Sequence, residues 1–155
     1  STQAKTLFPY TTLFRSCFYH NAPDRLRVAC VLAGKAHGNG RRIVVFAPDG
    51  GVARQFDQML WTFTPLAFVP HVAATSPLAA ETPVVIGTQF EGLPHDDVLI
   101  NLGDDLPAGF ERYRLVIEIV GRSDPERQAA RGRYRAYQGR GCALRAHDLA
   151  QRSGE

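Results

Sequence analysis

Short, strongly apolar runs alternate along this chain with segments whose apolar residues recur at helical spacing. Residues 42–47, 84–87, 97–102 and 115–120 are continuous runs rich in Val, Ile and Leu, which is typical of strands covered on both faces. Residues 17–20, CFYH, are expected to be the stub of a first strand. The alternation predicts an α/β fold: a single Rossmann-like, three-layer domain with a central, mostly parallel sheet flanked by helices.

Three longer helices are predicted between these strands. The first begins after Asp24, the second covers residues 48–63, and the third covers residues 123–141, with Ser123 or Asp124 as its cap and Gly139 at its end. The buried faces of the first two are expected to consist of Leu26, Ala29, Cys30, Ala33 and Ala36, and of Val52, Phe56, Leu60 and Phe63. Residues 64–83 are expected to be irregular, and residues 107–114 to form a short helix.

The first 16 residues do not fit this pattern. The stretch TLFPYTTLFRS has no acidic residue and no periodicity, and Pro9 interrupts it, so it resembles neither a signal peptide nor a membrane span. Read back into codons, it matches the in-frame translation of a widely used sequencing adapter. We therefore predict that residues 1–16 are an adapter-derived, disordered addition, with LFRS able to complete a truncated first strand. Residues 17–150 are then a single domain and residues 151–155 a tail.

Charge is distributed unevenly. The net charge is +3, but residues 122–155 contain 8 arginines against four acidic residues, whereas residues 17–121 are net acidic. This asymmetry indicates an acidic partner for the C-terminal end, either nucleic acid or an acidic peptide.

The motifs that would indicate catalysis are weak. Glycines in GKAHGNG end a helix, and PDGG follows a strand without a phosphate-binding pattern. His95, Asp96 and Asp97 are expected to form a solvated turn, and His71 is expected to be structural. Cys17, Cys30 and Cys142 have no metal-ligand or disulfide spacing, which favours free thiols in a reducing cytoplasm. We therefore expect no enzyme, no metal and no cofactor.

Two segments are candidates for binding. Arg127, Arg131 and Arg135 are spaced i, i+4, i+8 on the last predicted helix, and Tyr134 lies beside them. A guanidinium binds a carboxylate bidentately and an adjacent aromatic ring supplies an apolar wall, so this stripe would suit an acidic peptide with an apolar last residue. A solvated basic face and direct binding of nucleic-acid phosphates remain alternatives.

The second candidate is the aromatic segment LWTFTPLAFVPH. Trp61 is expected at the end of the second helix and Phe68 in the irregular segment after it. Packing in the core is the ordinary role of such residues. Their position beside proline-containing bends also fits a protein-binding patch, because interface hot spots favour large aromatics.

Over residues 18–149 the chain resembles the chi subunits of bacterial DNA polymerase III holoenzyme. The likeness rests on FYHNAPDRLRVACVLAGKA, APDGGVARQFDQMLWTFTPLAFVPH, PLAAETPVVIG, LPHDDVLINL and LVIEIVGRSDPERQAARGRYRAYQGRGCALRAHDL, in this order. The resemblance implies a noncatalytic, cytoplasmic accessory protein without cofactor, metal or membrane contact. It also implies partners: the psi subunit, which links such proteins to the clamp loader, and the acidic, Phe-ending C-terminal tail of single-stranded DNA-binding protein. Contact with DNA would be indirect.

By residue match, the resemblance places the tail site on Val120, Arg127, Arg131, Tyr134 and Arg135, and the psi-facing patch on Trp61 and Phe68. Gly132 is a departure, because many relatives have Glu at this position. The rival function is direct binding of nucleic acid by the C-terminal arginines. A nucleotide-processing enzyme, suggested by fold analogy alone, is a more distant alternative.

Overall fold

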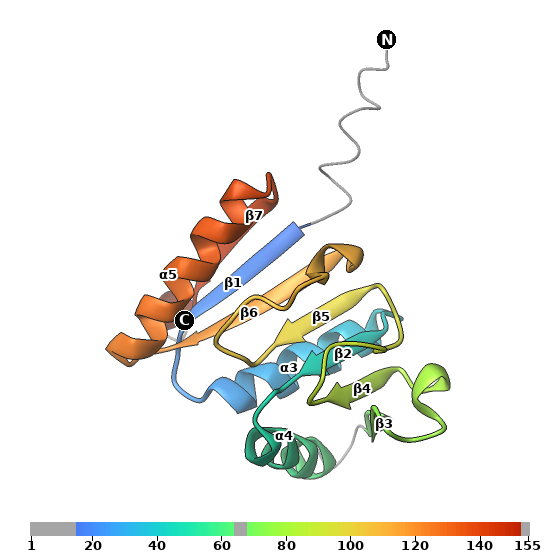
Figure 1. Ribbon diagram of the computed structural model, residues 1–155. Coiled ribbons are helices and arrows are strands. Elements are labelled where there is room, and N and C mark those ends of the chain that lie inside the picture. Colours follow the sequence, from blue (N-terminus) through green and yellow to red (C-terminus); the bar gives the residue numbers. More distant parts are fainter. Residues whose placement is uncertain (1–14, 64–67, 153–155) are drawn as a thin grey trace.

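The computed structural model describes residues 15–63 and 68–152, and its centre is a sheet of seven strands in the order β3-β4-β2-β5-β6-β1-β7 (Figure 1). Every pairing between neighbouring strands is parallel. The strands are β1 (Arg15–Ala22), β2 (Ile43–Phe46), β3 (His71–Ala73), β4 (Val84–Gly87), β5 (Val98–Asn101), β6 (Leu115–Gly121) and β7 (Ala143–Asp148).

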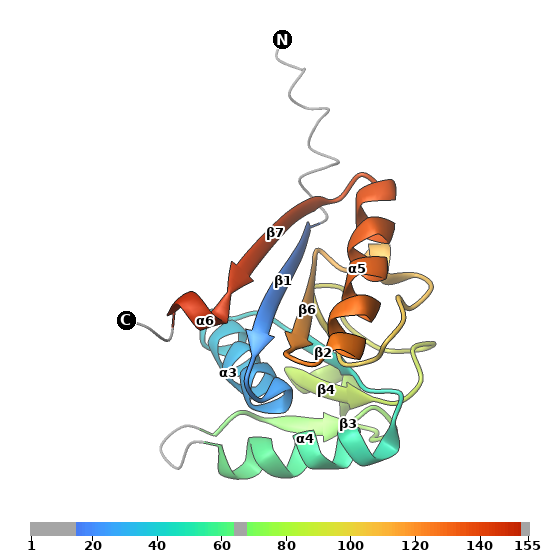
Figure 2. The same ribbon diagram turned by 90° about the vertical axis from the view of Figure 1, so that its left-hand side faces the viewer.

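Helices cover both faces of the sheet. They are α3 (Arg25–Gly38), α4 (Gly50–Thr62), α5 (Asp124–Gly139) and α6 (Leu149–Arg152), with single 3-10 turns η1 (Ala79–Glu81) and η2 (Phe110–Arg112). α3 and α4 pack side by side on one face and α5 lies on the other (Figures 1 and 2). This arrangement confirms the predicted three-layer α/β fold. Among the described residues, no helix is both long enough and apolar enough to cross a bilayer.

Side-chain caps explain where the helices begin, and those of the first and third helices were predicted from the sequence. Asp24 accepts a hydrogen bond from the Arg27 amide at 3.2 Å, and Asp49 accepts one from the Gly51 amide at 2.8 Å. For α5 the cap is Ser123, whose hydroxyl accepts from the Glu126 amide at 3.3 Å and donates to the Glu126 carboxylate. The Ser123 hydroxyl thereby satisfies one of the backbone donors that the first turn of a helix leaves unpaired, and the Glu126 carboxylate holds that hydroxyl in place.

Strand β1 begins earlier than the apolar pattern indicated. Arg15 and Ser16 already pair with Leu115 and Val116 of β6 on one side and with β7 on the other. Two residues assigned to the adapter-like head therefore belong to the sheet. Residues 1–14 of that head lie outside the described residues, as do residues 153–155 of the predicted tail, whereas residues 151 and 152 belong to α6.

Two strands were not expected from the sequence. β3 lies within the stretch predicted to be irregular, and β7 follows the last long helix and forms an edge of the sheet. The predicted helix at residues 107–114 is reduced to the single turn η2.

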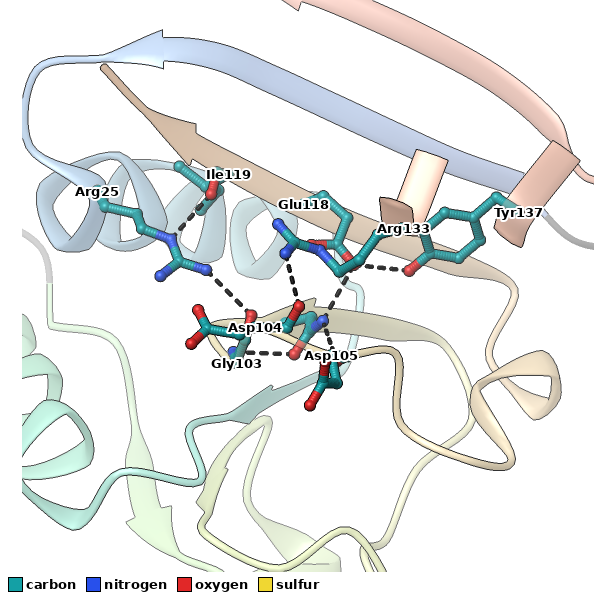
Figure 3. A network of polar contacts seen from close by, with 9 residues as sticks. Arg25, Gly103, Asp104, Asp105, Glu118, Ile119, Arg133 and Tyr137 are labelled. Atoms are coloured by element: carbon teal, nitrogen blue, oxygen red, sulfur yellow. Dashed lines mark hydrogen bonds and ion pairs between the residues drawn. The ribbon is translucent and has the colours of Figure 1, made fainter. Parts of the chain in front are cut away.

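A buried polar network fixes α5 to the sheet (Figure 3). Glu118, in the middle of β6, is fully buried and accepts hydrogen bonds from Arg133 at 2.8 Å, Tyr137 at 2.7 Å and Asn101 at 3.0 Å. Burial raises the pKa of the Glu118 carboxyl, and the Arg133 guanidinium is the foremost of the contacts that oppose this shift. Because a buried carboxylate is costly without partners, the network dictates which side of α5 faces the sheet.

Candidate functional site

A groove with a volume of about 470 Å³ runs between α5 and the uncovered part of the sheet at β1 and β7. We call it the α5 groove. It is lined by Phe18, His20, Asn21, Val120, Arg127, Ala130, Arg131, Tyr134 and Ala146.

Strand and helix periodicity bring these residues together. Phe18 and His20 are two apart on β1 and therefore project from the same face of the sheet, and Ala146 of β7 is the register partner of Phe18. On α5, the lining positions 127, 130, 131 and 134 follow the spacing of one helical face. The adjacent, sheet-facing side of α5 holds Arg133 and Tyr137, which contact Glu118.

The α5 groove has an apolar floor and a basic rim. Phe18, Val120 and Ala130 are buried, whereas the side chains of Arg127 and Arg131 are exposed. Tyr134 is half-buried and packs edge-on against Phe18, with 5.2 Å between ring centroids. An apolar hollow beside two guanidinium groups can hold an apolar side chain and its carboxylate at the same time.

Four of the five residues predicted for the tail site line this groove: Val120, Arg127, Arg131 and Tyr134. Arg135 is exposed on α5 but is not among the lining residues. Sequence reasoning missed the contribution of β1 and β7, which is Phe18, His20, Asn21 and Ala146, and also missed Ala130 of α5. The segment CFYH pointed to a strand, but nothing local indicated that one face of this strand lies beside α5.

The aromatic segment forms a separate surface. Trp61, near the end of α4, and Phe68 are 56% and 59% exposed, and their ring centroids are 5.2 Å apart. The ring of His71, which is buried, lies 4.8 Å from that of Trp61. We call Trp61 and Phe68 the aromatic patch. Both residues predicted for the psi-facing patch are thus neighbours on the surface; residues 64–67 between them lie outside the described part of the chain.

His71 has the structural role expected of it. Its Nδ1 lies 2.7 Å from the carbonyl oxygen of Val69, and its Nε2 lies 3.2 Å from Asp57 Oδ1 on α4, without the alignment of a hydrogen bond. These contacts hold the ring beneath the aromatic patch.

The turn at residues 95–97 is not simply solvated, as was expected. Asp97 forms an ion pair with Arg41, whose Nε donates at 2.9 Å, and it also accepts from the Arg42 amide at 3.1 Å. The hydrogen bond from Arg41 is the main cause that lowers the pKa of Asp97. Through these contacts Asp97 links the start of β5 to the segment that follows α3.

The described residues contain no cluster of three His, Cys, Asp or Glu side chains that could hold a metal ion. The three cysteines are free thiols. Burial raises the pKa of Cys30 to about 12, and it raises the pKa of Cys17 as well, so neither thiol is activated.

Known proteins that this chain matches are chi subunits, in agreement with the resemblance seen in its sequence. The profile of the family described as "DNA polymerase III chi subunit, HolC" matches residues 14–145. The DNA polymerase III subunit chi of Pseudomonas aeruginosa is 37% identical over 125 residues, which cover 81% of this chain and 87% of that protein. The subunits chi of Escherichia coli and Haemophilus influenzae are 29% and 27% identical, over 76% and 79% of this chain and 81% and 85% of their own lengths. The chain belongs to the DNA polymerase III chi subunit family.

Proposed function

We propose that this protein is an accessory subunit that tethers the replicative polymerase to coated template by binding the C-terminal tail of single-stranded DNA-binding protein in the α5 groove. Family membership implies an accessory role in replication. The observation that supports the choice of ligand is the convergence of Arg127, Arg131 and Tyr134 around a floor made by Phe18 and Val120.

Different parts of the peptide would contact the apolar floor and the basic rim of the groove. The terminal Phe side chain would enter the hollow beside Val120 and Tyr134, and its α-carboxylate would meet Arg127 and Arg131. Neighbouring Asp side chains of the tail would be attracted by the same rim and by Arg135 further along α5. Many copies of single-stranded DNA-binding protein coat one strand of template, and each carries a tail. Binding these tails therefore raises the local concentration of the polymerase assembly there.

Titration of the protein with a labelled acidic, Phe-ending peptide tests this proposal. Arg131→Ala is expected to weaken binding by about 1.5–3 kcal/mol, the range for hydrogen bonds to charged groups. The matched control is Arg145→Ala, because Arg145 is an exposed arginine next to Ala146 on β7 and projects from the opposite face of the sheet. Equal losses in the two variants, or none in either, would refute the groove as the peptide site.

We further propose that the aromatic patch binds the psi subunit. Two large aromatic side chains, each more than half exposed and in mutual contact, have the composition of an interface hot spot. Trp61→Ala and Phe68→Ala are expected to weaken psi binding by at least about 2 kcal/mol while the affinity for the tail peptide stays unchanged. Leu78→Ala is the control, because Leu78 is a similarly exposed apolar residue between β3 and η1. Loss of both activities together would mean that the patch residues support the fold.

Direct nucleic-acid binding by the C-terminal arginines is the alternative. Phosphate recognition requires the exposed guanidinium groups but makes no use of the apolar floor beneath them. This alternative predicts appreciable affinity for bare single strands with a steep dependence on salt. A gel-shift experiment with and without the coating protein distinguishes the two functions, since the tether requires the coating protein.

A further inference from the structure

We propose that Asn21 is a specificity-determining residue of the α5 groove, because its amide keeps Arg127 apart from Asp148 and so leaves the Arg127 charge available to an incoming carboxylate. This inference rests on the proposed function of the groove and identifies what selects its anionic ligand.

Asn21 lies between a cation and an anion. Its Oδ1 accepts a hydrogen bond from Arg127 Nη2 at 3.1 Å, and its Nδ2 donates to Asp148 Oδ1 at 2.8 Å. The amide can satisfy both neighbours in this orientation alone, because the reverse would place its NH₂ against a guanidinium and its oxygen against a carboxylate. Arg122 donates to the Asn21 carbonyl oxygen at 3.3 Å and so helps to fix the backbone at this end of β1.

The backbone restricts which residues can take this place. Asn21 has φ = 63°, in the left-handed region, where Asn, Asp and Gly are favoured over other residues. Of these three, Gly would remove the spacer and Asp would neutralise Arg127. Asn alone combines the conformation with a neutral acceptor for the guanidinium and a donor for the carboxylate.

The consequence is electrostatic. None of the ion pairs between described residues involves Arg127, although Asp148 lies one amide away from it. A guanidinium that is held by a neutral oxygen keeps its full charge and loses little freedom when a carboxylate arrives. If Asp148 paired with Arg127 directly, the ligand carboxylate would have to displace it.

A charge swap tests the proposal in the full-length protein. The double variant Asn21→Asp/Asp148→Asn keeps the net charge, the backbone preference at residue 21 and the chain of hydrogen bonds. The side-chain oxygen introduced at position 148 can still accept from the Ala150 amide, as Asp148 does at 3.0 Å. The probe is the labelled acidic, Phe-ending peptide. We expect the swap to weaken binding about tenfold, because the new carboxylate at residue 21 neutralises Arg127. Unchanged affinity in a folded swap variant would overturn the inference.

A second pair of variants does not depend on the folding of the swap. Asn21→Gly allows the left-handed backbone conformation at residue 21 but removes the spacer, so we expect weaker peptide binding that is restored when Asp148→Asn is added. Loss without restoration would show that Asn21 acts through the fold. In an Arg127→Ala background the swap should have no further effect, whereas a purely structural role would weaken binding there as well.

Peptide binding by the parent protein distinguishes a failure of this inference from a failure of the proposed function. If the parent does not bind the peptide, the proposed function fails. If the parent binds and the swap binds equally well, only the role of Asn21 fails.

Discussion

Helix α5 carries arginines in two contrasting environments, two residues apart. Arg133 is 5% exposed, forms an ion pair with the buried Glu118 and donates to the carbonyl oxygen of Asp104 at 2.8 Å. Arg131 is exposed at the rim of the α5 groove. The difference follows from helical geometry, because positions two apart lie on nearly opposite sides of a helix. One arginine therefore fixes the helix to the sheet, and the other is accessible at the rim of the groove.

The largest effect on stability is expected at the buried arginine, Arg133. Arg133→Ala would leave the Glu118 carboxylate buried without its cation, so we expect the free energy of unfolding to fall by about 3–5 kcal/mol. Urea denaturation measures this loss, with Arg131→Ala expected to stay within about 0.5 kcal/mol of the parent. A similar loss of stability for the two variants would mean that the buried and the exposed side of α5 contribute equally to the fold.

Gly132, between these two arginines, provides a smaller test. It is exposed, and a Cβ built there meets no atom within 4 Å. Gly132→Ala is expected to stabilise the protein by up to about 1 kcal/mol, because alanine favours the helix over glycine. Thermal unfolding measures the gain, and affinity for the tail peptide should not change. A destabilised variant would mean that the α5 backbone at this position is not an ordinary helix.

Arg135 sharpens the limits of the groove. It belongs to the predicted tail site, but it is not a lining residue, so it can act on the ligand mainly through longer-range attraction that salt screens. Arg135→Ala is expected to weaken peptide binding by about 0.5 kcal/mol or less in physiological salt. Peptide titration at two salt concentrations measures it. A loss equal to that of Arg131→Ala would extend the site along α5.

The smallest effect is expected at the ion pair of Arg41 and Asp97, whose exposure to solvent lies between that of Arg133 and that of Arg131. Asp97 has a pKa held below its usual value, mainly by the hydrogen bond from Arg41. A carboxyl group with a lowered folded pKa stabilises the protein above its unfolded pKa of about 3.9, and that contribution is lost as pH falls through the folded pKa. Asp97→Asn should therefore flatten the acid side of the stability profile slightly, which urea denaturation at a series of acid pH values measures. An unchanged profile would mean that this pair does not contribute.

The sequence predicted the layers of the fold because the central strands are continuous apolar runs and the helices carry explicit caps. It did not predict β7, whose residues Ala143–Asp148 include charges and lack β-branched side chains. As an edge strand, β7 is defined by its pairing with the distant β1, which local composition does not encode.

The candidate site, too, could be predicted from the sequence only in part. Helical spacing was sufficient to predict Arg127, Arg131 and Tyr134 on one side of the groove. The opposite wall depends on which strands lie beside α5, so Phe18 and Asn21 could not be assigned to it. Glu118 did leave a signal, since a lone carboxylate within LVIEIV requires a buried partner, but the sequence did not identify Arg133 as that partner.

The most direct test of the central claim compares two peptides on the parent protein: the acidic, Phe-ending tail with a free terminal carboxylate, and the same peptide ending in an amide. If Arg127 and Arg131 receive the terminal carboxylate, the amide should bind at least about tenfold more weakly, and the difference should shrink in Arg131→Ala, where only Arg127 remains to receive it. Equal affinity for the two peptides would contradict the account, because the basic rim would then recognise nothing specific to a chain terminus.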